Sequence, residues 1–586
     1  MIKKLINKFF TFFKYICSST ACYIIDLSVF SILSYLLKNI PGVKYILIST
    51  VCARILSSFI NFILNKNKVF GQDKSDKNNN VNLMLNYYLL VIVQMFISAI
   101  SAEIVYKLTN YNLVLIKFIV DCVILVANYF IQKKYIFNNK FINFKNSFKS
   151  LFVFIKENKL ICVILFISLV LHIAVLFTLG VDYGLNSDDA SYIASGIYFK
   201  NNLTIIMHGT QSAQIMPGMT YLIALISYFV GEGLALIVTL KILWMLMGLL
   251  SILGVYKIVR LFSNKIFSSI SAAFLLVIDF IWMDNTILTE TPFMFGFIFL
   301  IYSSLMLART KKQKYFYQVV AFYMFSILFK ANIAPYPVFL IIYLLLNKYD
   351  LKLLGKQMLI SAAILSVFFI PWIIRNYVVF DKFIPLTYGS GDPLLLGTYQ
   401  GYNYPEDNEE EYKKYVDTHA SDEMKSYING TATEKLYKTR YYDLEKEKFI
   451  AQYRIKEWWN NDKISMLKSY LIYKPYVNMY CTFYWETIWG ITSEMILLIR
   501  KIDIILTIIC GIVTLFNRKY FKELLFLAFN YIFQIAVYSY TFAFSRYGQT
   551  ILFIRFIIIG IGLQIIYNFI KNKIIKLKNY KLEKGV

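Results

Sequence analysis

Charged residues are scarce in this chain. Only 16% of its 586 residues are Asp, Glu, Lys or Arg, whereas 58% are hydrophobic and 18% are aromatic. A soluble protein of this length has no interior large enough to bury so much apolar surface, which excludes a soluble globular fold. Apolar stretches of roughly 17 residues or more recur from end to end, and each is long enough to cross a hydrocarbon core of about 30 Å. The sequence therefore predicts an all-α polytopic membrane protein.

Cysteine and histidine are also few. The chain has seven cysteines and three histidines, and the cysteines lie mostly inside apolar stretches without metal-ligand spacing. The long polar segment 381–480 contains no cysteine. These features argue against a disulfide framework and against a structural zinc site. We interpret His172, His208 and His419 as structural.

Acidic residues are outnumbered by basic ones. The chain carries 35 Asp and Glu against 61 Lys and Arg, which gives a formal net charge of +26. The lysines cluster between the apolar stretches and do not form one basic face. This is the positive-inside pattern, which sets orientation and meets anionic head groups. It predicts a multi-pass protein of the bacterial plasma membrane with both termini cytoplasmic, and it argues against nucleic acid as a partner.

The basic tracts divide the chain into two membrane blocks. Tracing them as cytoplasmic predicts about fourteen transmembrane helices, among them 266–284 and 498–516. The apolar segment 214–231 is predicted to lie along the outer interface, because a span there would place two later basic clusters outside. The expected organisation is a four-helix domain at 1–138, a basic cytoplasmic linker at 139–159, a larger membrane domain at 160–570 with external loops at 181–233 and 375–497, and a basic cytoplasmic tail at 571–586.

The first block contains an internal repeat. The stretch SFINFILNKNKVF at 58–70 aligns with LVANYFIQKKYIF at 125–137. Asn61, Lys66 and Phe70 then match Asn128, Lys133 and Phe137, each at an offset of 67 residues. The block is therefore predicted to be a duplicated two-helix hairpin with both copies in the same orientation.

The first block resembles the GtrA-like family over nearly all of residues 9–138. The resemblance depends on ACYIIDLSVFSILSYLL, which contains Asp26, and on the helix exit at 61–70. Family members are small four-helix proteins that accompany glycosylation of surface polymers. The resemblance implies that this domain helps to move polyprenyl-phosphate sugars across the membrane, along polar residues such as Asp26, Arg54, Asn61 and Asn128. The alternative is a scaffold in which those residues, with Glu103 and Asp121, join helices.

Acidic and basic residues of the second block converge on one face. The helix at 160–180 is predicted to run outward, which places Asp188 and Asp189 of SDDASYIASGI at the external surface. The same tracing brings Glu290 of NTILTETPF to that surface. It does the same for the segments PWIIRNY and SRYGQ. This convergence at the outer membrane surface is the strongest functional signal in the sequence.

The second block resembles the C-type (GT-C) glycosyltransferases, the group with protein O-mannosyltransferases and lipid A aminoarabinose transferases. SDDASYIASGI is similar to their first external acidic motif, with Asp189 in place of a Glu, and TETPF is similar to the second. PWIIRNYVVFDKFIPLTYGSG and FSRYGQTILFIRF are similar to later junctions of the family. The resemblance implies inverting transfer of a sugar from a polyprenyl-phosphate donor to a cell-surface acceptor on the external face.

The resemblance also implies roles for individual residues. Asp188 occupies the position of the catalytic base, and Asp189 and Glu290 orient the acceptor or support the base. Cations at the head-group plane are expected to bind the donor phosphate. The candidate cations are Lys241, Lys330, Arg375, Arg546 and Arg555. A divalent cation is a possible cofactor, and Asp188 and Glu290 are its candidate ligands.

The sequence leaves several alternatives open. The chief rival function is a flippase or transporter of lipid-linked sugars that makes no bond, and a polysaccharide polymerase or ligase ranks below it. The expected partners are the polyprenyl-phosphate sugar, a surface glycan, lipid or protein as acceptor, membrane lipids, and a cytoplasmic synthase of the donor. Which sugar is carried and which acceptor receives it are not encoded in any pattern we identify.

Overall fold

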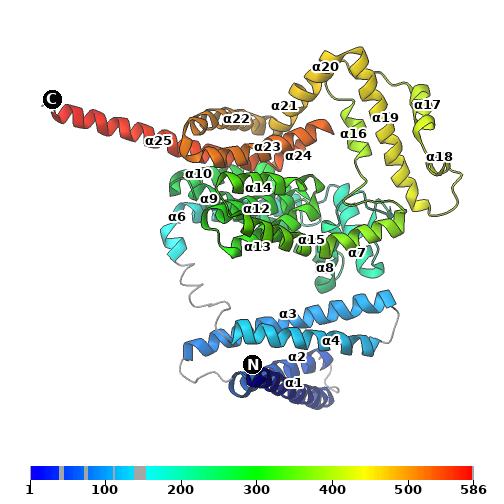
Figure 1. Cartoon of the computed structure of the whole chain (residues 1–586), viewed down its shortest axis with the longest axis vertical. Helices are drawn as coiled ribbons and strands as arrows, with labels where there is room; N and C mark the ends of the chain where they lie inside the picture. Colours follow the sequence, from blue (N-terminus) through cyan, green and yellow to red (C-terminus); the bar gives the residue numbers. More distant parts are fainter. Residues whose placement is uncertain (1, 38–44, 71–76, 110–112, 138–152, 584–586) are drawn as a thin grey trace. The chain divides into compact units, whose positions relative to one another are not determined.

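The computed structural model describes residues 2–37, 45–70, 77–109, 113–137 and 153–583. They form two compact units, Met1–Glu157 and Asn158–Val586. Most of the predicted linker at 139–159 lies outside the described residues. Each unit is considered by itself below (Figure 1).

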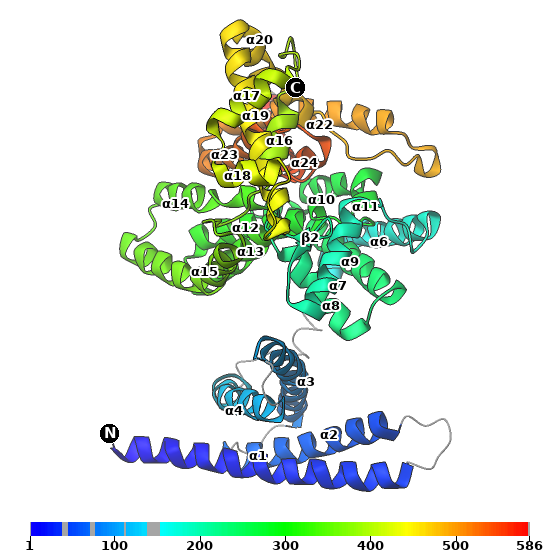
Figure 2. The ribbon, with the colours of Figure 1, turned by 90° about the vertical axis from the view of Figure 1, so that its right-hand side faces the viewer.

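Unit 1 consists of four long helices arranged as two pairs (Figure 2). Each pair ends in a five-residue π-helix, and the two π-helices are again 67 residues apart. The elements are α1 (Ile2–Leu37), α2 (Tyr45–Leu64), η1 (Asn65–Val69), α3 (Lys77–Thr109), α4 (Leu113–Ile131) and η2 (Gln132–Ile136).

Equivalent residues of the two hairpins meet in unit 1. The Asn65 side-chain amide donates to Gln132 Oε1 over 3.2 Å, and these two residues are 67 positions apart. The rings of Phe70 and Phe137 stack with their centroids 4.8 Å apart. Because residues at the repeat offset contact each other, the structure confirms the duplicated hairpin. The repeat interface is the core of this unit.

Unit 2 is a larger helical bundle with short connecting helices. Its membrane-type helices are α6 (Lys159–Leu179), α9 (Leu234–Arg260), α10 (Lys265–Ala273), α11 (Ile278–Met283), α12 (Glu290–Thr310), α13 (Gln313–Phe329), α14 (Tyr336–Leu346), α15 (Leu351–Phe380), α22 (Ser493–Phe516), α23 (Phe521–Tyr540) and α25 (Leu552–Glu583). Three short helices precede or link them: α7 (Asp188–Asn202), α8 (Gly218–Val230) and α24 (Ser545–Gln549).

The predicted number of membrane spans is not confirmed. Seven helices among the described residues are long and apolar enough to cross a membrane, and several shorter apolar helices accompany them. The expected span 266–284 is broken, because α10 ends at Ala273 and α11 begins only at Ile278. α8 has 13 residues, which is about 20 Å at 1.5 Å per residue and too short to cross. This agrees with the prediction that segment 214–231 does not span.

A small β-hairpin interrupts the otherwise helical chain. Strands β1 (Ile206–Met207) and β2 (Thr210–Gln211) pair antiparallel between α7 and α8. The turn between them has positive φ at His208 and Gly209, 50° and 79°, which is the geometry of tight two-residue hairpins. The sequence pattern gave no indication of these strands, since each has only two residues.

The segment between α15 and α22 forms a helical arm at one end of unit 2 (Figure 1). It contains α16 (Gly391–Gly397), α17 (Glu409–His419), α18 (Asp422–Ile428), α19 (Thr439–Asn461), α20 (Lys463–Lys468) and α21 (Lys474–Met479). The α7 helix lies at the same end as the arm, and the C-terminal part of α25 projects at the opposite end (Figure 1). Asp188 and the arm therefore share one side of the bundle, as the topological tracing predicts.

Candidate active site

A cavity of about 400 Å³ lies where the arm meets the bundle. Four charged side chains on its wall form what we call the site cluster: Asp188, Glu290, Lys330 and Arg546. They come from α7, α12, the end of α13 and α24, which are far apart in the sequence. The other polar lining residues include His208, Gln214, Thr289, Asn332, Thr387, Ser390, Asp392, Arg440, Tyr192, Tyr538, Thr541 and Tyr547.

Asp188 is the accessible carboxylate of the site cluster. It begins α7, and its side chain is 31% exposed. An acidic residue in the first turn is favoured there by the helix dipole. Arg546 Nη1 lies 2.7 Å from Asp188 Oδ2. A carboxylate held at a cavity wall by one guanidinium has free lone pairs for another donor.

Glu290 is the buried hub of the site cluster. It begins α12 and is fully buried, with 0% exposure. Its Oε1 lies 2.8 Å from Lys330 Nζ and 2.8 Å from Arg546 Nε. Because Arg546 also contacts Asp188, the guanidinium bridges both carboxylates. The two acids and two cations balance in charge, so this buried group does not leave an uncompensated ion.

Aromatic rings hold the two cations in place. Lys330 Nζ lies 4.8 Å from the centroid of the Tyr547 ring, and Tyr547 stacks on Tyr538 at 5.1 Å. A cation above an aromatic face is stabilised by the quadrupole of the ring. Arg546 lies over the ring of Phe483, 5.8 Å from its centroid. Both cations are thus held against rings at the cavity wall, and 12% of each side chain is exposed.

Asp189 does not line the cavity. It is buried, and its two carboxylate oxygens accept hydrogen bonds from the backbone N–H groups of Leu185 and Ser187, at 2.6 Å and 2.9 Å. These bonds organise the loop that delivers Asp188 to the start of α7. Asp189 thus contacts the backbone before α7 and does not face the cavity. Ser187 occupies the N-cap position of α7 but makes no side-chain cap bond.

Arg375 also lies outside the cavity lining. Its guanidinium donates to the carbonyl of Ser212 at 2.9 Å, to the carbonyl of Ile205 at 3.4 Å and to the Asn376 side chain at 3.0 Å. These bonds fix both ends of the β-hairpin, which brings Met207 and His208 to the cavity wall. In this structure its donors are directed to backbone carbonyls.

Two further predicted donor-phosphate cations lie away from the cavity. Lys241 is buried in α9 and donates to the carbonyl of Gly180 over 3.4 Å. Arg555 is buried in α25, is ion-paired with Asp503 and donates to the carbonyl of Met479 over 2.6 Å. The structure therefore brings together Asp188, Glu290, Lys330 and Arg546, and separates the other predicted site residues from them.

The predicted polar path of unit 1 is only partly described. Ser57 donates to Asp26 over 2.8 Å, and Ser18 donates to Asn61 over 3.2 Å. Asn128 is buried, at 8% exposure. The side chains of Arg54 and Glu103 lie outside the described residues. Asp121 accepts a bond from Ser98.

Several lining residues were not predicted from the sequence. His208 was interpreted as structural, and Tyr192, Gln214, Asp392 and Arg440 were not considered. Tyr192 lies four residues after Asp188, so helical periodicity alone puts the two on one face. Gln214 precedes α8, and Asp392 and Arg440 belong to the arm, where no apolar periodicity in the sequence indicates a direction. Arg440 Nε lies 3.4 Å from Gln214 Oε1, so this wall is polar.

The residues present do not fit a divalent cation. Within the described part of the chain no group of three or more His, Cys, Asp or Glu is placed to hold a metal ion. The guanidinium of Arg546 already occupies the space between Asp188 and Glu290. A second cation between the same carboxylates would meet a like charge.

Comparison with known families agrees with the two-unit organisation. Residues 14–137 match the GtrA/DPMS transmembrane domain, and residues 214–374 match the dolichyl-phosphate-mannose-protein mannosyltransferase family. The chain is a GtrA-like domain fused to a C-type glycosyltransferase domain. The mannosyltransferase match covers the part of this glycosyltransferase domain that contains Glu290 and Lys330. A search of curated proteins finds no match to the chain.

The fusion is also similar to solved structures. One is the archaeal oligosaccharyltransferase AglB from Archaeoglobus fulgidus in complex with an inhibitory peptide and a dolichol-phosphate, with 13% identity, a TM-score of 0.42, and coverage of 74% of this chain and 52% of that chain. Another is ArnT from Cupriavidus metallidurans in the apo state, with 12% identity, a TM-score of 0.31, and coverage of 68% and 77%. A third is ArnT from Cupriavidus metallidurans bound to undecaprenyl phosphate, with 12% identity and a TM-score of 0.32. The match covers 70% of this chain and 78% of that chain. The chain spans about half the length of the archaeal protein.

Proposed function

We propose that this C-type glycosyltransferase transfers a sugar from a polyprenyl-phosphate donor to a cell-surface acceptor on the external face of the membrane. The observation that carries the proposal is the site cluster, in which an accessible carboxylate and two cations line one cavity. A donor phosphate needs cations at the edge of the bilayer, and the acceptor needs a base. The family match to mannosyltransferases that use dolichyl-phosphate-mannose supports this donor class.

The four residues then take separate roles. The donor phosphate binds Lys330 and Arg546. Among the described residues, Arg440 is the one other basic side chain of Lys or Arg type that lines the cavity. When the phosphate engages Arg546, Asp188 is freed from its ion pair to accept a proton from the acceptor hydroxyl. The acceptor oxygen attacks the anomeric carbon, and the bond from that carbon to the phosphate oxygen breaks, which leaves the lipid phosphate on the cations. Glu290 keeps both cations in place throughout.

The GtrA-like domain is proposed to supply the donor. Its polar residues lie within the apolar helices of unit 1, where they are costly unless paired or used. This proposal predicts a cytoplasmic synthase that makes the lipid-linked sugar and a fusion that couples its delivery to its use. Both termini are then cytoplasmic, and the arm is external.

The test is transfer by the purified full chain in detergent. A polyprenyl-phosphate sugar is added with surface acceptor extracted from a strain that lacks this protein, and bound donor and product are measured separately. Sugar attached to acceptor with release of polyprenyl phosphate supports the proposal. Donor that binds and crosses liposomes without product supports the rival flippase function. A shortened protein that lacks residues 1–157, and therefore unit 1, is expected to retain transfer in detergent and to lose it in cells.

A further inference from the structure

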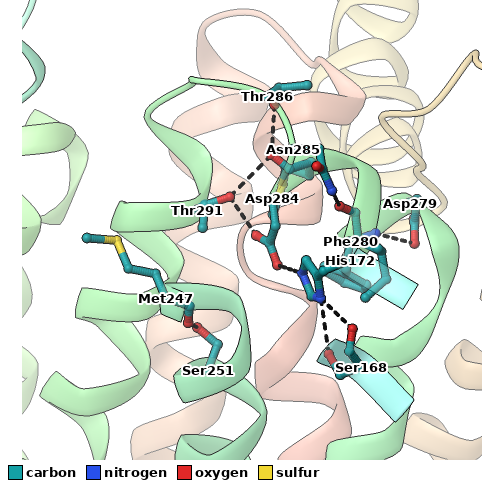
Figure 3. Close-up of polar contacts among 12 residues, drawn as sticks. Ser168, His172, Met247, Ser251, Asp279, Phe280, Asp284, Asn285, Thr286 and Thr291 are labelled. Atoms are coloured by element: carbon teal, nitrogen blue, oxygen red, sulfur yellow. Dashed lines mark hydrogen bonds and ion pairs between the residues drawn. The ribbon is translucent and has the colours of Figure 1, made fainter. Parts of the chain in front are cut away.

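A second chain of buried polar contacts lies next to the site cluster. Figure 3 shows its members: His172 on α6, Asp284 just after α11, and Thr291 in the first turn of α12. His172 Nε2 lies 3.1 Å from Asp284 Oδ2, and the Thr291 hydroxyl donates to Asp284 Oδ1 over 2.7 Å. None of the three is more than 3% exposed. The chain joins three helices at the point where α12 begins.

The contacts fix how many protons this pair holds. His172 Nδ1 lies 2.7 Å from the backbone carbonyl of Ser168, which can only accept, so Nδ1 carries a hydrogen. The remaining contact joins Nε2 to a carboxyl oxygen, and two lone pairs at that distance would repel. One further proton must lie between them. The pair is therefore neutral overall, either as imidazolium with carboxylate or as imidazole with carboxylic acid.

Other charged groups near the pair already have partners of their own. Among the described residues, the side chains of His172 and Thr291 hydrogen-bond to the Asp284 carboxyl group. On the packed elements, Glu290 is held by Lys330 and Arg546, and Asp279 is held by Arg500. Lys241 and Lys257 of α9 lie one or more helical turns away along that helix. The shared proton is thus set by His172 and Asp284 themselves.

The bundle reserves space for this pair. Gly248 of α9 faces it, and a Cβ atom at that position would overlap Asp284 Oδ2 and lie 3.2 Å from His172 Nε2. Any side chain larger than hydrogen at position 248 would push His172 and Asp284 apart. A glycine in the middle of a helix costs stability relative to alanine, so its presence here marks a close approach.

We propose that His172 and Asp284 are positioning residues, which share one proton and, through Thr291, fix the first turn of α12. The inference rests on the proposed function, because Glu290 is adjacent to Thr291 and holds both donor-phosphate cations. A first turn that shifts would move Glu290, and with it Lys330 and Arg546. Misplacement by about 1 Å can cost roughly a hundredfold in rate.

The first test removes one hydroxyl. Thr291→Val keeps size and shape but breaks the bond to Asp284. It is expected to lower turnover about tenfold to a hundredfold and to weaken donor binding by a smaller factor, because Lys330 and Arg546 shift with Glu290. Thr286→Val is the matched control. Thr286 is buried in the loop between α11 and α12 and donates to the Met283 carbonyl over 2.7 Å (Figure 3). Equal loss in both variants, or no loss in Thr291→Val, overturns the proposal.

A second test separates positioning from stability. Asp284→Asn can donate to Nε2 and still accept from Thr291, so it mimics the neutral shared-proton arrangement and is expected to retain most of the turnover. Asp284→Leu removes the carboxylate that contacts both His172 Nε2 and the Thr291 hydroxyl, and it is expected to lose both stability and turnover. The double variant His172→Leu with Asp284→Leu restores an apolar contact and is expected to regain stability only. Full recovery of turnover in the double variant would show that the pair is merely structural.

Two readouts do not need transfer activity. The chain has three histidines, so ¹⁵N-histidine spectra of the full protein are simple to assign with His208→Gln and His419→Gln variants. We expect the Nδ1 nitrogen of His172 to carry hydrogen, and an Nε2–H tautomer with bare Nδ1 would refute the proton count. Hydrogen exchange at residues 289–293 is expected to be about tenfold faster in Thr291→Val than in Thr286→Val. These results stand even if the wild-type protein proves to transport its lipid without transfer.

Discussion

Two clusters in the glycosyltransferase domain have the same balance of charges and different surroundings. The site cluster pairs Asp188 and Glu290 with Lys330 and Arg546. What we call the bundle cluster pairs Asp279 and Asp503 with Arg500 and Arg555: Arg500 Nη2 lies 2.5 Å from Asp279 and Nη1 3.4 Å from Asp503, which is also paired with Arg555. Each cluster has two acids and two cations.

The difference is access. Every side chain of the bundle cluster is 0% or 1% exposed, and none of them lines the cavity. The bundle cluster instead ties α11, α22 and α25 to the end of the arm, since Arg500 and Arg555 also donate to the carbonyls of Cys481 and Met479. Charges inside a membrane protein are therefore not by themselves a sign of a site. An ion pair that opens on a cavity is the more specific sign.

The largest expected effect is loss of the proposed base. Asp188→Asn keeps size and hydrogen bonding but cannot take a proton, so turnover is expected to fall about 10²–10⁴-fold. Donor binding is expected to remain, because Lys330 and Arg546 are unchanged. The measurement is single-turnover transfer with bound lipid quantified separately. Turnover within a few-fold of wild type would contradict the role of Asp188 as the base. The site cluster would then no longer differ from the bundle cluster in catalytic role.

The bundle cluster is expected to respond in stability. Arg500→Met leaves Asp279 and Asp503 buried with one cation fewer, which is expected to cost about 3–5 kcal/mol of unfolding free energy. Thermal unfolding in detergent measures the loss, and active-site titration of the folded fraction measures turnover per folded molecule. We expect that turnover to stay near the wild-type value. A normal melting temperature with lost turnover would instead assign the bundle cluster to the mechanism.

A cation of the site cluster is expected to affect donor affinity. Lys330→Met removes one charge-assisted contact to phosphate, worth about 1.5–3 kcal/mol, or roughly tenfold to a hundredfold in Kd. Lys241→Met is the matched control, because Lys241 is also buried but donates to a backbone carbonyl. Equilibrium binding of a polyprenyl phosphate to both variants makes the comparison. If Lys241→Met weakens binding as much as Lys330→Met, the cavity is not the phosphate site.

The smallest expected effect concerns a buried cation in the arm. Lys474 donates to the Thr541 carbonyl over 3.3 Å and lies 3.6 Å from the centroid of the Tyr470 ring. Burial lowers its pKa to about 7. Between pH 7 and the ordinary lysine pKa of about 10.4, the unfolded chain binds a proton that the folded chain does not, so stability rises with pH in that window. The melting temperature is expected to rise from pH 7.5 to 9.5, and to rise less in Lys474→Met.

The sequence predicted the parts of the fold that depend on apolar length and on repetition. Helices α6, α9, α12 and α25 follow long apolar stretches, and the hairpin repeat followed from matched residues such as Phe70 and Phe137. Breaks inside apolar stretches were not predictable, because the stop between α10 and α11 has no Pro, Gly or charge before Asp279. A 3-10 turn at Phe274–Leu276 follows α10 directly, and no local pattern indicates it.

The candidate site was predictable in its acids and only partly in its cations. Asp188 and Glu290 stand at helix starts close to apolar stretches, where acidic residues are conspicuous. Choosing among five cations needed distances, since the side chains of Lys241, Arg375 and Arg555 turn to backbone carbonyls or to Asp503. The contacts of Asp189 were equally unpredictable, because the sequence does not distinguish an aspartate that organises a loop from one that faces a cavity. Sequence indicates that charges gather at one surface, and geometry decides which of them face open space.

The final helix is longer than a single crossing of the membrane requires. α25 runs unbroken from Leu552 to Glu583, which is about 48 Å at 1.5 Å per residue, whereas the hydrocarbon core is about 30 Å thick. It starts two residues after α24, which carries Arg546, and its far end carries five lysines from Lys571 onward. The segment predicted as a tail is thus a continuation of α25, and the helix is longer than a crossing of the hydrocarbon core requires. One continuous helix therefore connects the basic C-terminal segment to the short turn that follows Arg546.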